Sequence, residues 1–155
     1  MSEIVALNQH EFLVDERDGK GRGAGNNAKI KQIFKIDLAN AVDVSNMDGT
    51  QAAASAVSKS LFLDIVAVLT ANGITADVIP PKLEGLAFGP DVSGGTTHTL
   101  WVSNDNDFLQ DFGGTEANPN QFFVFGFMTP ISAGHNTCRN NRSCQWIDYC
   151  NGERT

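Results

Sequence analysis

The chain has 155 residues, of which 41% are hydrophobic, and its 11 basic and 18 acidic residues give a formal net charge of −7. This length predicts one domain, and the acidic balance argues against binding to nucleic acid, which requires a basic patch or stripe. No run approaches the roughly 18 apolar residues of a membrane-spanning helix, so we expect no membrane span. The first residues contain neither a basic segment nor a long apolar stretch, so no secretory signal is visible.

Two strands are expected in the first part of the chain. Glu11–Asp15 is short with an apolar centre, and Lys29–Leu38 alternates between polar and apolar residues, a pattern typical of a half-buried strand. Four glycines and two asparagines lie between them, within Asp18–Asn27, so we expect a hairpin loop there. A P-loop is excluded because that motif needs Gly-Lys-Ser/Thr leading into a helix.

The middle of the chain predicts a surface loop, a strand and a helix. Residues 39–58 are polar, rich in alanine and longer than most loops, so we expect a surface excursion. Lys59–Leu63 follows as a strand. The next ten or so residues are expected to form one short helix, with Asp64 as its N-cap and Gly73 just after its C-terminus.

Two later segments have acidic ends. The apolar strand expected within 83–91 is entered through Glu84, and the strand that begins at Leu100 ends in the four oxygen-bearing side chains 104–107. Antiparallel neighbours bring these ends to one rim of a sheet if their register allows it. Alternation within a strand predicts that the two aspartates of 104–107 share one face.

Short strands, glycine-rich loops and one small helix predict an all-β meander, in which Gln121–Phe127 is the last strand. An open meander exposes strand edges, and a propeller protects them by arranging four-stranded blades in a ring. The expected strands supply about one to two of the 4–8 blades of a ring, so we expect a partial β-propeller, a fragment of a larger ring. We assign residues 1–128 to this domain and expect an irregular, cysteine-containing tail at 129–155.

All three cysteines lie in this tail, at Cys138, Cys144 and Cys150, with five residues between neighbours. An odd number leaves one thiol unpaired even if a disulfide forms. A zinc site that includes His135 is a further alternative, although the spacing departs from the usual pairs. The sequence leaves the disulfide state open.

The ordered series of segments resembles the phytase-like esterase family, a β-propeller group described by the phrase "esterase-like activity of phytase". The matching stretches are residues 12–19, 33–38, 41–45, 59–64, 83–91, 103–108 and 121–125. The series looks like the C-terminal portion of that family's domain, since the domain is typically longer than this chain. The resemblance implies a hydrolase of phosphate esters and an exported protein, periplasmic or extracellular.

The resemblance also implies that glutamate and aspartate side chains perform the catalysis. We hypothesise that Glu84, Asp105 and Asp107 hold a divalent cation, with calcium favoured because it takes six to eight oxygen ligands. Such a cation would polarise the phosphoryl oxygen and activate a bound water. Glu16 would then act as the general base.

Three further residues are expected to bind a small phosphate-ester substrate. Arg17 suits bidentate contact with a phosphate, Asp18 lies beside it, and Lys82 offsets the repulsion between the carboxylates and an anionic substrate. Structural alternatives stand beside these roles. Residues 16–18 also suit a charged turn that neutralises itself, Lys82 can pair with Glu84 at the solvent edge, and residues 104–107 can bond the turn backbone.

These residues and the family resemblance together point to two functions. The first is a metal-dependent hydrolase of phosphate esters, and the second is a non-catalytic, calcium-stabilised β-propeller binding module. Ser-His-Asp catalysis is not expected, because His10, His98 and His135 have no partner in a Gly-x-Ser-x-Gly elbow. The other expected partners are the remaining blades of the propeller or further copies of the chain.

Overall fold

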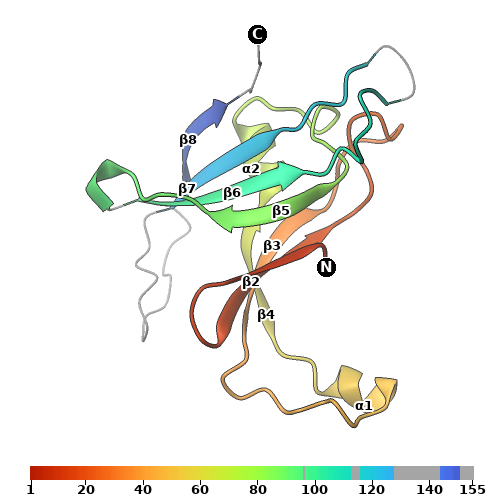
Figure 1. The fold of residues 1–155 in the computed structure, drawn as a ribbon, viewed down its shortest axis with the longest axis vertical. Helices are drawn as coiled ribbons and strands as arrows, with labels where there is room; N and C mark the ends of the chain where they lie inside the picture. Colours follow the sequence, from red (N-terminus) through yellow and green to blue (C-terminus); the bar gives the residue numbers. More distant parts are fainter. Residues whose placement is uncertain (96, 113–115, 128–143, 151–155) are drawn as a thin grey trace.

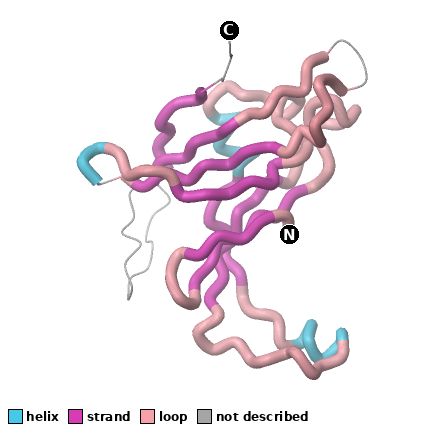
Figure 2. The backbone as a smooth tube through the Cα atoms, viewed as in Figure 1, coloured by secondary structure: helices cyan, strands magenta, loops and turns pink. Residues whose placement is uncertain are grey.

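The computed structural model describes residues 1–95, 97–112, 116–127 and 144–150, which form two four-stranded antiparallel sheets (Figures 1 and 2). The first sheet contains β1 (Glu3–Ala6), β2 (Glu11–Arg17), β3 (Lys31–Asp37) and β4 (Lys59–Asp64). The second contains β5 (Leu83–Phe88), β6 (His98–Asn104), β7 (Phe122–Phe127) and β8 (Cys144–Cys150). Neighbours in each sheet are neighbours in the chain, so the predicted all-β meander is confirmed.

In the described ranges, three short helical segments accompany the sheets: α1 (Gly49–Ala54), α2 (Ile65–Ala71) and a 3₁₀ turn at Ser93–Gly95. The predicted helix is α2, and its expected cap is present, because the Asp64 side chain accepts a hydrogen bond from the backbone N–H of Ala67 at 3.0 Å. Within the described part of the chain, no helix is long and apolar enough to cross a membrane.

Helix α1 lies in the segment that we expected to be an uninterrupted loop. Asp48 and Gln51 form a capping box, in which the side chain of each residue accepts a hydrogen bond from the backbone N–H of the other. The sequence therefore carried a local signal for this helix. Figure 1 shows α1 at the end of the molecule farthest from the second sheet, so it takes no part in the site described below.

Two strands were not predicted. β1 is short and pairs with β2 along Glu3–Ala6. Its side chains alternate between partly buried and exposed, and four residues are too few to give a clear strand pattern in the sequence. β8 lies in the tail that we expected to be irregular, and its backbone pairs with β7. The expectation of an irregular tail is therefore wrong for Cys144–Cys150. Cys138 and His135 lie outside the described residues, as do the side chains on which the disulfide and zinc alternatives depend.

The hydrophobic core lies between one face of each sheet. Alternation along the strands places every second side chain on this face, and α2 adds its buried residues at one side. The fully buried apolar members are Leu13, Ile33, Ile65, Leu69, Ile79, Leu83 and Leu100. The contacts between the two sheets are made mainly by β1 and β2 with β5, so the start of β5 is held against the end of β2.

Three loops meet at one end of the two sheets, and we call this region the loop rim. It consists of the β2–β3 loop (residues 18–30), the α2–β5 connection (72–82) and the β6–β7 loop (105–121). Backbone N–H groups of Arg22 and Ala28 donate to the carbonyls of Ile79 and Ala76, both at 2.9 Å. Arg22 also pairs with Glu116 at 2.7 Å, so all three loops are joined.

Candidate functional site

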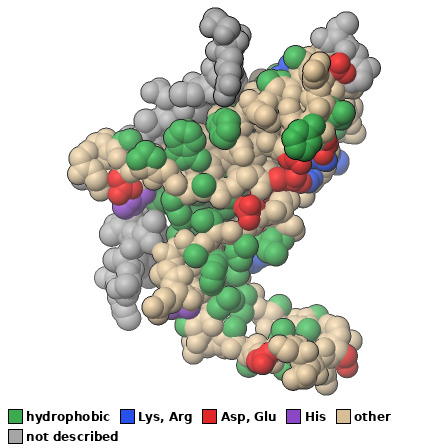
Figure 3. All heavy atoms as spheres, viewed as in Figure 1, with side chains coloured by type: hydrophobic (Ala, Val, Ile, Leu, Met, Phe, Trp, Pro, Cys, Tyr) green, Lys and Arg blue, Asp and Glu red, His purple; other side chains and the backbone are tan. Residues whose placement is uncertain are grey.

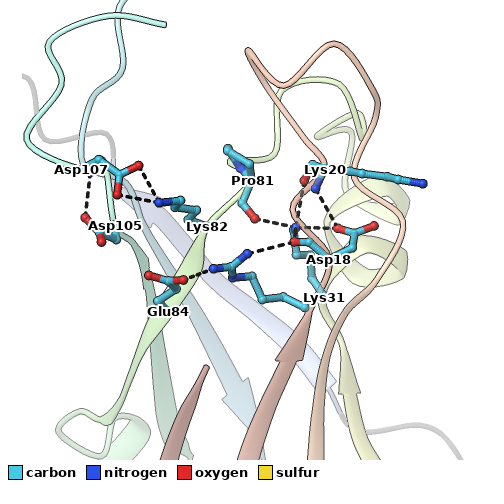
Figure 4. Close-up of polar contacts among 9 residues, drawn as sticks. Asp18, Lys20, Lys31, Pro81, Lys82, Glu84, Asp105 and Asp107 are labelled. Atoms are coloured by element: carbon cyan, nitrogen blue, oxygen red, sulfur yellow. Dashed lines mark hydrogen bonds and ion pairs between the residues drawn. The ribbon is translucent and has the colours of Figure 1, made fainter. Parts of the chain in front are cut away.

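The predicted functional residues gather at the loop rim, because β2 ends there and β5 begins there. In the register, Leu83 pairs with Asn104, and the N–H of Asp105 donates to the Lys82 carbonyl at 2.9 Å. The start of β5 and the end of β6 therefore lie side by side, so the register meets the condition that the sequence prediction set. Figure 3 shows acidic and basic side chains gathered along one edge of the molecule, and Figure 4 shows the contacts among them.

Arg17 and Glu84 form an ion pair that joins the two sheets. Arg17 is the last residue of β2 and Glu84 is the second residue of β5, and their side chains are 18% and 29% exposed. Both groups are therefore partly screened from water yet open to a small ligand. The alternative in which residues 16–18 neutralise one another is not observed, because each of the three pairs with a side chain from another strand.

A second ion pair lies beside the first. Lys82 Nζ contacts both carboxylate oxygens of Asp107 at 2.6 Å, and the two side chains are 38% and 44% exposed (Figure 4). Lys82 thus pairs with Asp107 rather than with Glu84. The result is a row of alternating charges along the rim, formed by Arg17, Glu84, Lys82 and Asp107.

Asp105 and Asp107 do not share a strand face. β6 ends at Asn104, and Asp107 lies in a turn with a positive φ of 54°. The Asp105 side chain accepts the backbone N–H of Asp107 at 2.8 Å, so the alternative in which these residues bond the turn backbone is the one observed. Four polar residues in succession favour such a turn over a further stretch of strand.

Behind this row lies a lysine that is fully buried. Lys31 opens β3, its side chain is 0% exposed, and its ammonium is surrounded by four oxygens (Figure 4). These are the Asp18 carbonyl at 2.7 Å, the Asp18 carboxylate at 2.8 Å, the Lys20 carbonyl at 2.8 Å and the Pro81 carbonyl at 2.7 Å. Burial disfavours the charged form of Lys31 and so lowers its pKa. Burial also disfavours the charged form of Asp18, but hydrogen bonds from Lys31 and from the Lys20 N–H outweigh this effect and keep the pKa of Asp18 below its ordinary value.

Asp15 is a second buried charge close to this cluster. It is 1% exposed, and its Oδ1 has no hydrogen-bond partner among the described residues. Burial raises the pKa of Asp15 to about 6, against the opposing effect of Arg17 and Lys31. Arg17 Nε is likewise buried without a partner in the described part of the chain, so two unmatched polar groups lie on the same face of β2.

The structure does not bring Glu16 to this group. Successive side chains of β2 point to opposite faces, and Glu16 binds Lys59 through both carboxylate oxygens at 2.7 Å. The histidines that are described also lie in exposed pairs, His10 with Asp37 and His98 with Asp91, each at 2.8 Å.

The arrangement of the carboxylates does not fit the expected cation. Glu84 and Asp107 are each paired with a protein cation, and Asp105 bonds a turn N–H. Among the described residues, no group of three or more His, Cys, Asp or Glu side chains is placed to hold a metal ion. A cation at this position would first have to displace Arg17 and Lys82 from their carboxylates.

Sequence reasoning missed Lys31 and Asp15. A signal was present, because each lies two residues from a core residue, Ile33 or Leu13, and therefore on the core face of its strand. A charged residue is almost never fully buried unless it is paired. A charge in register with the core thus predicts a polar cluster in the interior.

The fold and the rim define a mostly β protein of two antiparallel meanders whose joined ends carry paired charges. The sequence model of the family described as "Phytase-like: Esterase-like activity of phytase" matches residues 1–108. The chain therefore belongs to the phytase-like family, as the resemblance predicted. No curated protein and no solved structure matches the chain.

Proposed function

We propose that this protein is a hydrolase of phosphate esters whose substrate binds at the loop rim through Arg17 and Lys82. The observation that carries the proposal is the placement of these two cations in neighbouring ion pairs at the rim, since Arg17 pairs with Glu84 and Lys82 lies two residues before Glu84 in the chain. Both cations lie within the 108 residues that match the phytase-like family. Arginine and lysine are the usual phosphate-binding side chains, and arginine adds bidentate geometry. Both are partly exposed, as a binding site for a small anion requires.

In this proposal the carboxylates hold the cations in place until substrate arrives. A phosphoryl group replaces Glu84 on Arg17 and Asp107 on Lys82, and the two cations balance its charge. Glu84, released beside the phosphorus, takes a proton from the attacking water. A new phosphorus–oxygen bond forms, the bond to the alcohol breaks, and the alcohol leaves with a proton from solvent. Glu16 receives no step, since it lies on the opposite face of β2.

The divalent cation stays a prediction, with calcium as the favoured ion. No step above depends on it, because the three predicted ligands are engaged elsewhere. If bound, it would supply a Lewis acid for the phosphoryl oxygen.

We further propose that each four-stranded sheet is a propeller blade in an exported protein. The number and order of strands per sheet support this, since propeller blades are four-stranded meanders. On the outer face of the second sheet, small residues of β5 leave a hollow of about 530 Å³ beside Trp101 and Phe122, which are 38% and 46% exposed. Figure 3 shows hydrophobic side chains on the surface over this sheet. Another blade or a second copy of the chain would cover such a face.

Release of p-nitrophenol from p-nitrophenyl phosphate and from its bis ester tests the proposed activity. Arg17→Met is expected to lower kcat/KM by about 10²–10³-fold, as loss of one charge-stabilising donor does. Lys59→Met is the control, since it breaks a more exposed ion pair on the opposite face of β2, and should stay within about twofold of the wild type.

A chelator separates the remaining alternatives. Loss of hydrolysis in EDTA, reversed by calcium, supports the predicted cofactor, and unchanged hydrolysis contradicts it. Absence of hydrolysis by the wild type, together with a melting temperature that EDTA lowers, favours the calcium-stabilised binding module instead.

A further inference from the structure

The cluster around Lys31 connects the two proposed phosphate-binding residues. Asp18, whose carbonyl and carboxylate both accept from Lys31 Nζ, follows Arg17 directly in the chain. Pro81, whose carbonyl accepts from the same nitrogen at 2.7 Å, directly precedes Lys82. One buried ammonium therefore holds the backbone next to Arg17 on the first sheet and next to Lys82 at the entrance to the second.

The surroundings of the ammonium are those of a bound cation. Four oxygens from three separate chain positions lie 2.7–2.8 Å from one nitrogen, and three of them are backbone carbonyls, a ligand type that calcium sites also use. An ammonium has three N–H donors for four acceptors, so at least one proton is shared. The side chain that supplies this charge is 0% exposed, so water does not compete for the oxygens.

We propose that Lys31 is a positioning residue that sets the spacing between Arg17 and Lys82, and that its buried ammonium orders the two loops in the way that a bound cation would. The expected effect of Lys31 on catalysis rests on the proposed function, whereas its role in ordering the two loops does not. Lys31 does not reach the rim surface, so it acts on substrate only through the two loops that it joins.

Chemical rescue tests the inference. Lys31→Ala removes three methylene groups and the ammonium, which are the atoms of n-propylammonium apart from one hydrogen. The variant is expected to melt below the wild type and to lose about 100-fold in kcat/KM, the cost of misplacing binding groups by about 1 Å. Propylammonium is expected to raise the melting temperature of the variant and to increase its kcat/KM by at least about tenfold. Most of this increase should come from a lower KM, because the lost interactions orient binding groups.

Two controls isolate the charge. Leu13→Ala opens a cavity of purely apolar origin on the neighbouring strand, where Leu13 is 0% exposed, and propylammonium should not stabilise it. Propan-1-ol at the same concentration should not rescue Lys31→Ala. Equal rescue of both alanine variants, rescue by the alcohol, or no rescue at all would each overturn the inference. Rescue of the melting temperature without rescue of KM would overturn the positioning role.

The test separates this inference from the proposed function. An inactive wild type contradicts the proposed function, and the dissociation constant for inorganic phosphate then replaces KM as the measure of rim geometry. If Lys31→Ala does not fold alone, Lys31→Met keeps most of the side-chain volume and removes only the charge. Lys31→Met is then expected to bind phosphate about tenfold more weakly than the wild type, and unchanged affinity would overturn the inference.

Discussion

Lys31 and Asp15 lie on neighbouring strands of the first sheet, point to the same buried face, and are 0% and 1% exposed. They differ in what surrounds them. Lys31 has four oxygen acceptors, whereas Asp15 leaves one carboxylate oxygen without a partner in the described part of the chain. Equal burial therefore has opposite consequences, because a buried charge is tolerated where its hydrogen bonds are complete and destabilises the fold where they are not.

The difference arises from the loops rather than from the strands. Both residues are held by ordinary antiparallel pairing, but only Lys31 lies where the β2–β3 loop and the α2–β5 connection close over it. Their backbone carbonyls supply three of its four acceptors, through Asp18, Lys20 and Pro81. Changes that move these loops should therefore leave the buried Lys31 ammonium without some of its hydrogen-bond acceptors, and Lys31 would then destabilise the fold as Asp15 does.

The largest expected effect comes from Gly21→Ala. Gly21 has a φ of +143°, and a Cβ added there would lie 2.3 Å from the Ile79 carbonyl and 2.8 Å from the Pro81 nitrogen. The loop would have to move away from Pro81, which would separate two of the Lys31 acceptors. We expect a loss of about 3 kcal/mol or more in the free energy of unfolding, from backbone strain and overpacking together.

Gly25→Ala provides the control for Gly21→Ala in urea denaturation. Gly25 also has a positive φ, +72°, but an added Cβ meets no atom within 4 Å. Its cost should be limited to the conformational penalty of about 1–2 kcal/mol. Equal losses for the two variants would mean that the contact of Gly21 with the α2–β5 connection does not maintain the surroundings of Lys31.

Asp15→Asn is expected to stabilise the protein at neutral pH. The ordinary pKa of Asp15 is 3.8 and the folded value is about 6, so the folded state holds its proton more tightly than the unfolded state. Stability attributable to Asp15 is complete below pH 4, falls as the pH rises through 6, and is lost above it. The shift corresponds to at most about 3 kcal/mol, and we expect a gain of between about 1 and 3 kcal/mol at pH 8.

Urea denaturation of the wild type and Asp15→Asn at several pH values measures this gain. The difference between the two proteins should vanish near pH 4 and grow up to about pH 7. Asp43→Asn serves as the control of opposite sign, because hydrogen bonds from the Ser45 side chain and N–H lower the pKa of Asp43. A gain for Asp15→Asn that is constant with pH would show that the carboxylate is not the destabilising group.

Much of the fold could be predicted from local pattern. A short apolar centre predicted β2, alternation predicted β3, and an N-cap and a C-terminal glycine predicted α2. Antiparallel pairing predicted that the start of β5 and the end of β6 meet if the register allows it, and the register does. Each of these depends on residues close in the chain or on the geometry of a single hairpin. The phytase-like family was likewise predicted from the order of such segments.

The partners of the charges could not be predicted in this way. Arg17 and Glu84 are 67 residues apart and meet only because the two sheets pack with β2 near β5. The same packing directs Arg17 to Glu84 and leaves Lys82 for Asp107, whereas the sequence suggested that neighbours would pair. The register of Lys31 and Asp15 with core residues indicates that they are buried, but it does not identify their partners, since the loops that cover this end of the sheet leave no periodic pattern.

The smallest expected effect on stability comes from Lys82→Met, and it completes the comparison. Lys82 has the same ammonium as Lys31 and shorter contacts to its carboxylate, 2.6 Å, but its side chain is 38% exposed. Water and salt screen such a pair, so we expect a loss below about 1 kcal/mol that shrinks further in 1 M salt. Phosphate affinity should nevertheless fall, because Lys82 is proposed to contact the ligand and Lys31 is not. A loss of stability as large as that of Gly21→Ala would mean that burial does not separate the two lysines, and that the rim pair also holds the sheets together.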